Sequence, residues 1–329
     1  RTLHAMDGPH RESRRLFIRR SACIVGGGLL LRGCDVPPAT SPTISRSPAT
    51  NGSPTPVTAP PSGPATPDLT PPAVEPRIRV RLARARSGRA TTRVSAGPAR
   101  SWLRVADEQG GPEQVMRSPV QVRSDPGGWS VVDGDGVRTT IDPGVIEIGA
   151  VRGEPALVTL DGRPYPGSVV LVPRTEVDVG AYDVVNHTPV EVYLPGVLAK
   201  ELYASWHRET YRAQAIAARS FACNEIAWWS GRRHYDVVAG QASQAYIGAS
   251  AHTRAREAAA DTRGILLLWQ SRIVAAYYSS CCGGVSASAI DAISSHPVND
   301  ITPLTARPPH DCCRDAPVWR WQSEQGLSL

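Results

Sequence analysis

The sequence contains almost no lysine. Lys200 is the only lysine among 36 basic residues, so arginine carries nearly all of the positive charge, against 30 acidic residues. The net charge of +6 therefore reflects a chain-wide preference for arginine, and the acidic residues counterbalance most of it. We do not expect a nucleic-acid partner on this basis, whereas a wall polymer or an anionic membrane surface is compatible with the charge.

The chain also lacks a long apolar run. The apolar stretch within residues 21–31 has about ten residues, which is too few to span a bilayer. It follows "SRRLFIR" (residues 13–19) and precedes "RGCDVPP", and this order of basic, apolar and small residues is typical of an export signal. The basic motif resembles a twin-arginine signal, and Leu-Arg-Gly-Cys resembles a lipobox in which Cys34 is lipidated. We therefore expect residues 1–34 to direct the protein to the cell envelope or periplasm, anchored in the membrane by lipid.

Apolar bulk is scarce in the next segment. Residues 35–77 are rich in proline, serine and threonine. Such a segment cannot offset its ordering entropy by burial, so it is predicted to be a disordered linker. It can hold a folded domain away from a membrane or act as a plain flexible connection, and the composition fits both.

The remaining chain predicts an α+β fold. Residues 78–179 form short alternating β-branched runs, with Asp-Gly hairpin candidates at 133–134 and 161–162, and no catalytic constellation. Residues 194–230 have a helical pattern that Pro195 and Gly196 open and Gly231 ends. A second helical stretch at 251–264 and a hairpin turning at "WQSR" (269–272) follow.

Glu201 lies among apolar residues of the first helical pattern, between Leu198 and Leu202. Apolar surroundings raise the pKa of a carboxyl group toward neutrality, as a general acid requires. A single glutamate in an amphipathic helix can equally be a solvated surface charge, and the spacing does not decide between the two roles.

Several blocks of residues 180–321 together resemble the SpoIID/LytB family, which includes stage II sporulation protein D and amidase enhancers. The blocks are "YLPGVLAKELYASWHRETYRAQAIAARSFA", "YDVVAGQASQAYIG", "TRGILLLWQSRIVAAYYSSCCGG" and "DAPVWRW". The chain has the family's Tyr-Leu-x-x-Val from Tyr193 to Val197. It also has the family's Glu-x-Pro-x-Ser-Trp from Glu201 to Trp206, except at the proline, which is Tyr203 here. The residue that would break the helix after Glu201 is therefore missing. The resemblance implies a SpoIID-like domain over residues 180–329, with relatives that continue beyond this C-terminus.

The resemblance implies a peptidoglycan lytic transglycosylase with Glu201 as its catalytic acid. Such an enzyme cuts the bond from N-acetylmuramic acid to N-acetylglucosamine and leaves a 1,6-anhydro ring, in wall remodelling or sporulation-like processes. One carboxyl group suffices because no water attacks, in contrast to the paired carboxylates of ordinary glycosidases. The alternative is a non-catalytic activator of a cell-wall amidase that binds glycan strands with the same groove.

The resemblance also implies substrate-binding residues. Arg219, Gln244 and Tyr246 occupy family motif positions, although a capping or core hydrogen-bonding role suits each equally well. The turn after the hairpin contributes hydroxyl groups and close backbone approach to a sugar; its residues in this set are Ser279, Ser280, Gly283 and Gly284. Asp236 and Asp261 are reserve carboxylates, for which local helix or turn roles are favoured.

Two vicinal cysteine pairs outside the family pattern remain. Cys281 and Cys282 lie in the turn, and Cys312 and Cys313 lie later in the chain. At least one disulfide between the pairs is favoured because vicinal cysteines lack the spacer of a zinc knuckle, and a zinc site is the alternative. We predict no other cofactor.

Overall fold

A computed structural model describes residues 67–86, 90–97, 102–107, 113–125, 127–151, 156–279, 281–282 and 284–309. The expected signal at residues 1–34, with Cys34, and residues 35–66 of the expected linker lie outside the described residues. The prediction was wrong for residues 67–77, the end of the expected linker, which are part of the fold. Leu69 is 2% exposed, its carbonyl accepts a hydrogen bond from the Ile273 N–H at 2.8 Å, and Arg77 begins the first strand. Burial of Leu69 offsets part of the ordering entropy of this segment.

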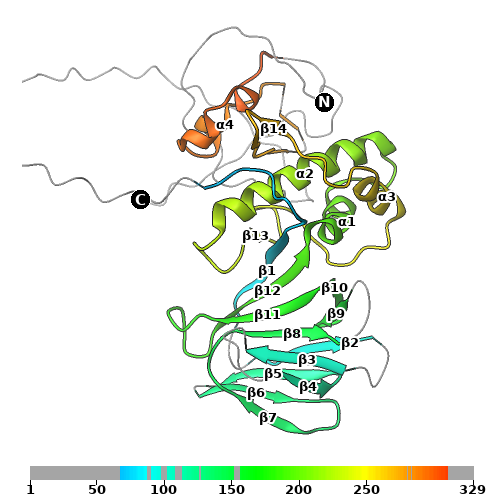
Figure 1. Cartoon of the computed structure of the whole chain (residues 1–329), viewed down its shortest axis with the longest axis vertical. Helices are drawn as coiled ribbons and strands as arrows, with labels where there is room; N and C mark the ends of the chain where they lie inside the picture. The colour runs from blue at the N-terminus through cyan, green and yellow to red at the C-terminus, as the bar shows by residue number, and fades with distance from the viewer. Residues whose placement is uncertain are drawn as a thin grey trace, which may run out of the picture. The chain divides into compact units, whose positions relative to one another are not determined.

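Strands between Arg77 and Val238 form a seven-stranded sheet (Figure 1). Its neighbours pair antiparallel apart from β1 and β13, which pair in parallel. In spatial order the strands are β13 (Val237–Val238), β1 (Arg77–Arg86), β12 (Tyr182–Pro189), β11 (Ser168–Pro173), β8 (Ile146–Ala150), β3 (Trp102–Asp107) and β4 (Gln114–Arg117).

A second, six-stranded sheet is antiparallel throughout. Buried and exposed residues alternate along its strands, most clearly along β5, so one face of the sheet packs against the interior. In spatial order the strands are β10 (Arg163–Pro166), β9 (Leu157–Leu160), β2 (Thr92–Ala96), β5 (Val120–Asp125), β6 (Gly128–Val132) and β7 (Arg138–Ile141).

One hydrophobic core joins the two sheets. Val94 and Val122 of the six-stranded sheet belong to the same cluster of fully buried side chains as Val105 and Ile148 of the seven-stranded sheet. β12 pairs with both β1 and β11. Strand pairing therefore continues across residue 180, at which the sequence analysis divides the chain.

The two Asp-Gly hairpin candidates are confirmed. β6 and β7 flank the turn at Asp133, and β9 and β10 flank the two-residue turn of Asp161 and Gly162. Both residues of the second turn have positive φ, 47° and 87°. A two-residue turn with positive φ at both positions matches the twist of the flanking strands, which is why the pair Asp-Gly favours it.

Three helices pack against one another and against β1 and β12, and β12 continues directly into the first of them (Figure 1). They are α1 (Val190–Glu201), α2 (Arg208–Trp229) and α3 (Thr253–Asp261). The remaining elements are β14 (Leu268–Trp269), β15 (Arg272–Ile273), α4 (Ala289–Ala292), and the 3-10 turns η1 (Pro297–Asn299) and η2 (Thr302–Leu304). The expected α+β composition is confirmed for the described residues.

The first helical pattern differs from its prediction at both ends. The helix begins at Val190 and not at Pro195, which lies inside α1 and removes one backbone hydrogen bond there. The helix also ends at Glu201, although Tyr203 replaces the helix-breaking proline. Leu202 is extended, with φ −115° and ψ 145°. His207 then caps α2, its Nδ1 accepting a hydrogen bond from the Glu209 N–H at 3.2 Å.

The expected hairpin at residues 269–272 forms, with strands of only two residues each. Gln270 and Ser271 turn the chain with positive φ, 48° and 62°. None of the described helices has the length and apolar character that crossing a lipid bilayer requires.

Candidate functional site

Glu201 lies at the C-terminal end of α1, where its side chain is half-buried. Its Oε1 accepts a hydrogen bond from the backbone N–H of Ala245 at 2.7 Å. Burial raises the pKa of the Glu201 carboxyl above its usual value of 4.5, although the Ala245 N–H and the charge of Lys200 lower it. A larger protonated fraction near neutral pH is the property that a general acid needs.

Two phenols lie close to this carboxyl group: Tyr193, which is fully buried, and Tyr278, which is half-buried. After the dominant effect of burial, the negative charge of Glu201 further raises the pKa of Tyr193 and of Tyr278. Tyr278 immediately precedes the Ser-Ser-Cys-Cys turn, so the fold brings the start of that turn to Glu201. The sequence analysis did not single out either phenol, because an isolated tyrosine in an apolar run gives no signal of its neighbours.

Gln244 positions the segment that contacts Glu201. Its side chain is fully buried and makes three hydrogen bonds. It accepts from the Tyr193 hydroxyl at 3.1 Å, and it donates to the Ala218 carbonyl at 3.2 Å and to the Tyr278 hydroxyl at 3.1 Å. Because Gln244 is held in this way, the N–H of the next residue points at the Glu201 carboxylate. Gln244 thus takes the core hydrogen-bonding role that the sequence left open.

Tyr246 also lies inside the fold. It is 8% exposed, its hydroxyl donates to Asn186 Oδ1 at 3.0 Å, and its ring packs 4.7 Å from that of Tyr193. Gly196 of α1 permits this approach, since a Cβ there would lie 2.7 Å from the Tyr246 ring and 2.2 Å from the Gly248 carbonyl oxygen. The contact fixes residues 244–248 against α1 and so helps to hold the Ala245 N–H near Glu201.

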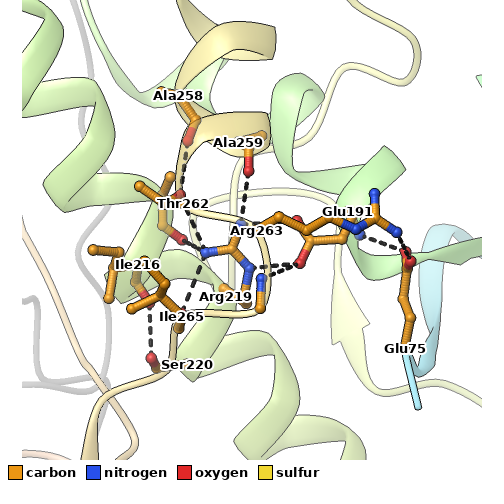
Figure 2. A network of polar contacts seen from close by, with 12 residues as sticks. Glu75, Glu191, Ile216, Arg219, Ser220, Ala258, Ala259, Thr262, Arg263 and Ile265 are labelled. Atoms are coloured by element: carbon orange, nitrogen blue, oxygen red, sulfur yellow. Dashed lines mark hydrogen bonds and ion pairs between the residues drawn. The ribbon is translucent and has the colours of Figure 1, made fainter. Parts of the chain in front are cut away.

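Arg219 is buried in a polar network at the other end of α1 (Figure 2). It is 2% exposed and pairs with Glu191 through two hydrogen bonds of 2.8 Å, from Nε and Nη2. Its guanidinium group also donates hydrogen bonds to four further oxygens. They are the carbonyl of Ala215 in α2, the carbonyl of Ala259 in α3, and the Thr262 hydroxyl and Ile265 carbonyl after α3. Arg219 therefore ties α1, α2 and α3 together, which is the core role left open in the sequence.

The same network caps the N-terminus of α1. Glu75 accepts a hydrogen bond from the Glu191 N–H at 3.1 Å and forms an ion pair with Arg263 (Figure 2). The Gly264 N–H donates to the Glu191 carboxylate at 3.0 Å. The helix that ends at Glu201 is thus fixed at its start by the buried Glu191–Arg219 pair and by the exposed Glu75–Arg263 pair.

The turn after Tyr278 is described in part. Ser279 is exposed and its hydroxyl donates to the Cys281 carbonyl at 3.4 Å. Gly284 is buried, with φ +83°, a conformation that side chains disfavour. Ser280 and Gly283 lie outside the described residues.

Cys281 and Cys282 are half-buried in this turn. Their expected partners Cys312 and Cys313 lie outside the described residues, so a disulfide or a zinc site between the pairs stays a prediction. Within the described ranges, no three His, Cys, Asp or Glu residues come together as metal ligands.

The two reserve carboxylates form ion pairs with residues distant in the sequence, in contrast to the local helix or turn roles that were favoured. Asp236 is 1% exposed, pairs with Arg79 at 2.6 Å and accepts the Arg79 backbone N–H at 2.8 Å. Asp261 forms ion pairs with Arg208 and Arg212 at 3.4 and 3.5 Å. The sequence analysis overlooked Glu225 of α2, a carboxyl whose pKa is raised by burial while the Trp229 indole donates to it at 3.1 Å.

Two aromatic rings beside Glu201 face solvent. Tyr203 is 71% exposed and Trp206 is 39% exposed, and their rings meet edge to face with centroids 5.4 Å apart. Large aromatic rings left in water commonly mark a binding surface. Tyr203 was noted in the sequence only as a departure from a family proline.

The fold and these residues define an α+β protein with a half-buried, protonatable glutamate at a helix end. Comparison with known proteins then gives the family: residues 178–269 match the family model SpoIID, described as Stage II sporulation protein. The chain is 33% identical over 132 residues to an uncharacterised protein of Brachyspira hyodysenteriae, covering 40% of this chain and 35% of that protein. It is 31% identical over 138 residues to the amidase enhancer of Bacillus subtilis, covering 42% of this chain and 18% of that protein.

Residues 178–269 are therefore similar to the SpoIID family, the resemblance that the sequence motifs predicted. The chain spans about a third of the length of the first relative and less than a fifth of the second. The matched region contains α1, α2, α3, Glu201 and Ala245, and Tyr278 lies beyond it.

Proposed function

We propose that this protein is a lytic transglycosylase that acts on the glycan strands of peptidoglycan. The observation that carries the proposal is the state of Glu201: a half-buried carboxyl at a helix end, held by the Ala245 N–H, whose pKa burial raises. The family match supports a role at the cell wall.

In the proposed reaction Glu201 acts twice. Its carboxyl proton moves to the glycosidic oxygen as the bond from that oxygen to the anomeric carbon breaks. The C6 hydroxyl oxygen of the same sugar then bonds to the anomeric carbon, and the Glu201 carboxylate takes the hydroxyl proton. The products are a 1,6-anhydro sugar and a free hydroxyl end, and Glu201 is protonated again. Among the described residues no hydrogen bond or ion pair joins Glu201 to a second carboxylate, which suits a one-carboxyl mechanism.

The test is digestion of purified peptidoglycan, and of strands stripped of their peptides, in water enriched in oxygen-18, with products read by mass spectrometry. The proposal requires 1,6-anhydro ends that carry no label. Reducing ends labelled with oxygen-18 would show hydrolysis and contradict it. Sedimentation of the protein with the same peptidoglycan, measured in parallel, separates a protein that does not bind from one that binds without turnover.

An amidase activator is the second candidate, because the matched Bacillus relative is named an amidase enhancer. This function predicts retained binding to peptidoglycan, no anhydro ends, and faster release of stem peptides when an amidase is added. The same digestion therefore distinguishes the two candidates.

The pH dependence of turnover follows from the raised pKa of Glu201. Because burial favours the protonated carboxyl, we expect kcat/KM to fall only above a pH that exceeds the usual glutamate value of 4.5. A falling limb centred at or below that value would argue against Glu201 as the acid. Measurement of initial rates across pH, on soluble glycan strands, gives the profile.

The free energy of unfolding should also depend on the titration of the Glu201 carboxyl. The pKa of Glu201 is higher in the folded than in the unfolded chain, so its contribution to stability is fully present below the unfolded pKa and is lost as pH rises through the folded pKa. The Glu201→Gln variant cannot titrate there. We therefore expect its stability relative to the wild type to increase across that window, as measured by denaturant unfolding at each pH.

The exposed aromatic pair should contribute to binding of glycan. A ring that packs on a sugar face contributes about 0.5–1.5 kcal/mol, so Tyr203→Ala is expected to raise KM about two- to tenfold with little change in kcat. The backbone carbonyl of Tyr203, which accepts from Trp206 N–H and the Tyr211 hydroxyl, is retained. Tyr203→Phe keeps the ring and should behave as the wild type; equal KM values for the two variants would exclude a stacking role.

A further inference from the structure

A recess away from the Glu201 site is lined chiefly by arginine. Its volume is about 440 Å³, and its lining includes Arg81 and Arg84 of β1, Arg174 after β11, and Arg232 and Arg233 after α2. None of the residues that line it belongs to the Glu201 site or is aliphatic. Three segments far apart in the sequence thus converge to place five guanidinium groups around one hollow.

A buried carboxylate organises the base of the recess. Asp183 is fully buried and accepts hydrogen bonds from the Ala85 N–H and from Arg174 Nη1, both at 2.7 Å. His234 Nε2 lies 2.9 Å and Arg81 3.7 Å from the same carboxylate. One side chain from each of the three segments therefore meets at Asp183, which holds the arginines around it in fixed positions.

Tyr235 and its neighbours restrain Arg81 and one further guanidinium group, that of Arg233. The Arg81 and Arg233 guanidinium groups lie 4.0 and 4.2 Å from the Tyr235 ring centroid. Arg233 also stacks on Trp229 at 3.4 Å and donates to the Tyr235 carbonyl at 2.7 Å. Guanidinium groups that are already stacked and hydrogen-bonded lose little side-chain entropy when an anion binds.

The charges of the recess do not cancel. Three carboxylates stand against the five arginines. Asp183 contacts Arg174 and Arg81, Glu176 pairs with Arg174, and Glu225 lies 3.9 Å from Arg233. Arg84 is exposed and forms no ion pair with any described residue. Positive charge therefore remains in excess in a concave site, which concentrates the field that an anion experiences.

We propose that this recess binds a phosphate group of a phosphodiester-bearing polymer of the cell wall, independently of the reaction at Glu201. Phosphate is favoured over carboxylate because its oxygens can meet more than one guanidinium fork at once. A polymer is favoured over a membrane because the site is a hollow lined by polar side chains, whereas a membrane surface is contacted by a flat or protruding face with apolar side chains. Binding there would hold the protein on the wall while Glu201 acts on glycan.

The experiment is titration calorimetry of the full chain with a poly(glycerol phosphate) oligomer, with inorganic phosphate and acetate as small-anion probes. We expect Arg84→Gln to weaken binding of the oligomer about tenfold, and Arg84→Gln with Arg232→Gln to weaken it further. Arg123→Gln removes the same charge from an exposed site on β5 and should leave the affinity unchanged. Phosphate should compete with the oligomer and acetate should not.

Three outcomes would overturn the proposal. Equal affinity in the wild type and the Arg84 and Arg232 variants would place binding elsewhere. Equal weakening by Arg123→Gln would show a general charge effect. The third outcome is that the Arg84 and Arg232 variants bind the oligomer as the wild type does but no longer bind vesicles with about 30% phosphatidylglycerol. This result would assign the recess to the membrane. Digestion of peptidoglycan strands free of phosphodiester polymer should be unchanged in these variants, so failure of this proposal and failure of the transglycosylase proposal are told apart.

Discussion

Glu201→Gln is expected to abolish the release of anhydro-ended glycan while leaving the protein folded. Removal of a general acid lowers rates by about 10²–10⁴-fold, and here the same group also serves as the base. Glutamine keeps the shape of the side chain, and its carbonyl oxygen can still accept the Ala245 N–H that Glu201 accepts at 2.7 Å. The measurement is the initial rate of formation of anhydro ends, with thermal unfolding of the same sample.

Two control variants make this result specific. Glu257→Gln makes the same chemical change at an exposed position of α3 and should leave the rate unchanged. Glu225→Gln removes the other carboxyl of the helical region whose pKa burial raises. If Glu225→Gln abolished the reaction and Glu201→Gln did not, the assignment of the acid would be wrong.

Arg219→Met is expected to lower the free energy of unfolding by about 3–5 kcal/mol, because it leaves the Glu191 carboxylate buried without its partner. The side chains of Arg219 and Glu191 are 2% and 9% exposed, so water cannot replace the lost hydrogen bonds. The main-chain carbonyls that the guanidinium contacts lose a donor as well (Figure 2). Denaturant unfolding of the variant measures the effect.

A matched variant and a double variant separate structure from substrate binding. Arg256→Met removes an exposed arginine of α3 and should change stability by no more than about 0.5 kcal/mol. Glu191→Leu combined with Arg219→Met removes both charges, and we expect it to recover part of the loss. If Arg219→Met instead folded with wild-type stability and lost affinity for glycan, Arg219 would be a binding residue.

Local sequence pattern was sufficient to predict several strands and turns of the fold. The alternating run that begins at Arg77 became β1, and the runs around Ile146 and Ser168 became β8 and β11. Both Asp-Gly pairs form hairpin turns, because their backbone preference is a property of the two residues themselves. The boundary of α1 was not predicted, because Pro195 was taken for a start signal and the missing proline at Tyr203 for a continuing helix.

The partners of the candidate site residues lay beyond any local pattern. The sequence singled out Arg219, Gln244 and Tyr246 by position in a motif, with a core role and a binding role both open. Only the fold places Glu191 beside Arg219 across 28 residues and Tyr193 beside Gln244 across 51 residues. Sequence separation of this size carries no periodic signal from which contact can be read.

The sequence by itself indicated the family region and the α+β composition, because motif spacing and apolar periodicity are local properties, and the family resemblance implied Glu201 as the candidate acid. Only the tertiary structure decided that the Glu201 carboxyl is half-buried and held by the Ala245 N–H, and that five arginines surround one recess. The physical reason is that burial and electric field depend on every group that packing brings near, whatever its place in the chain.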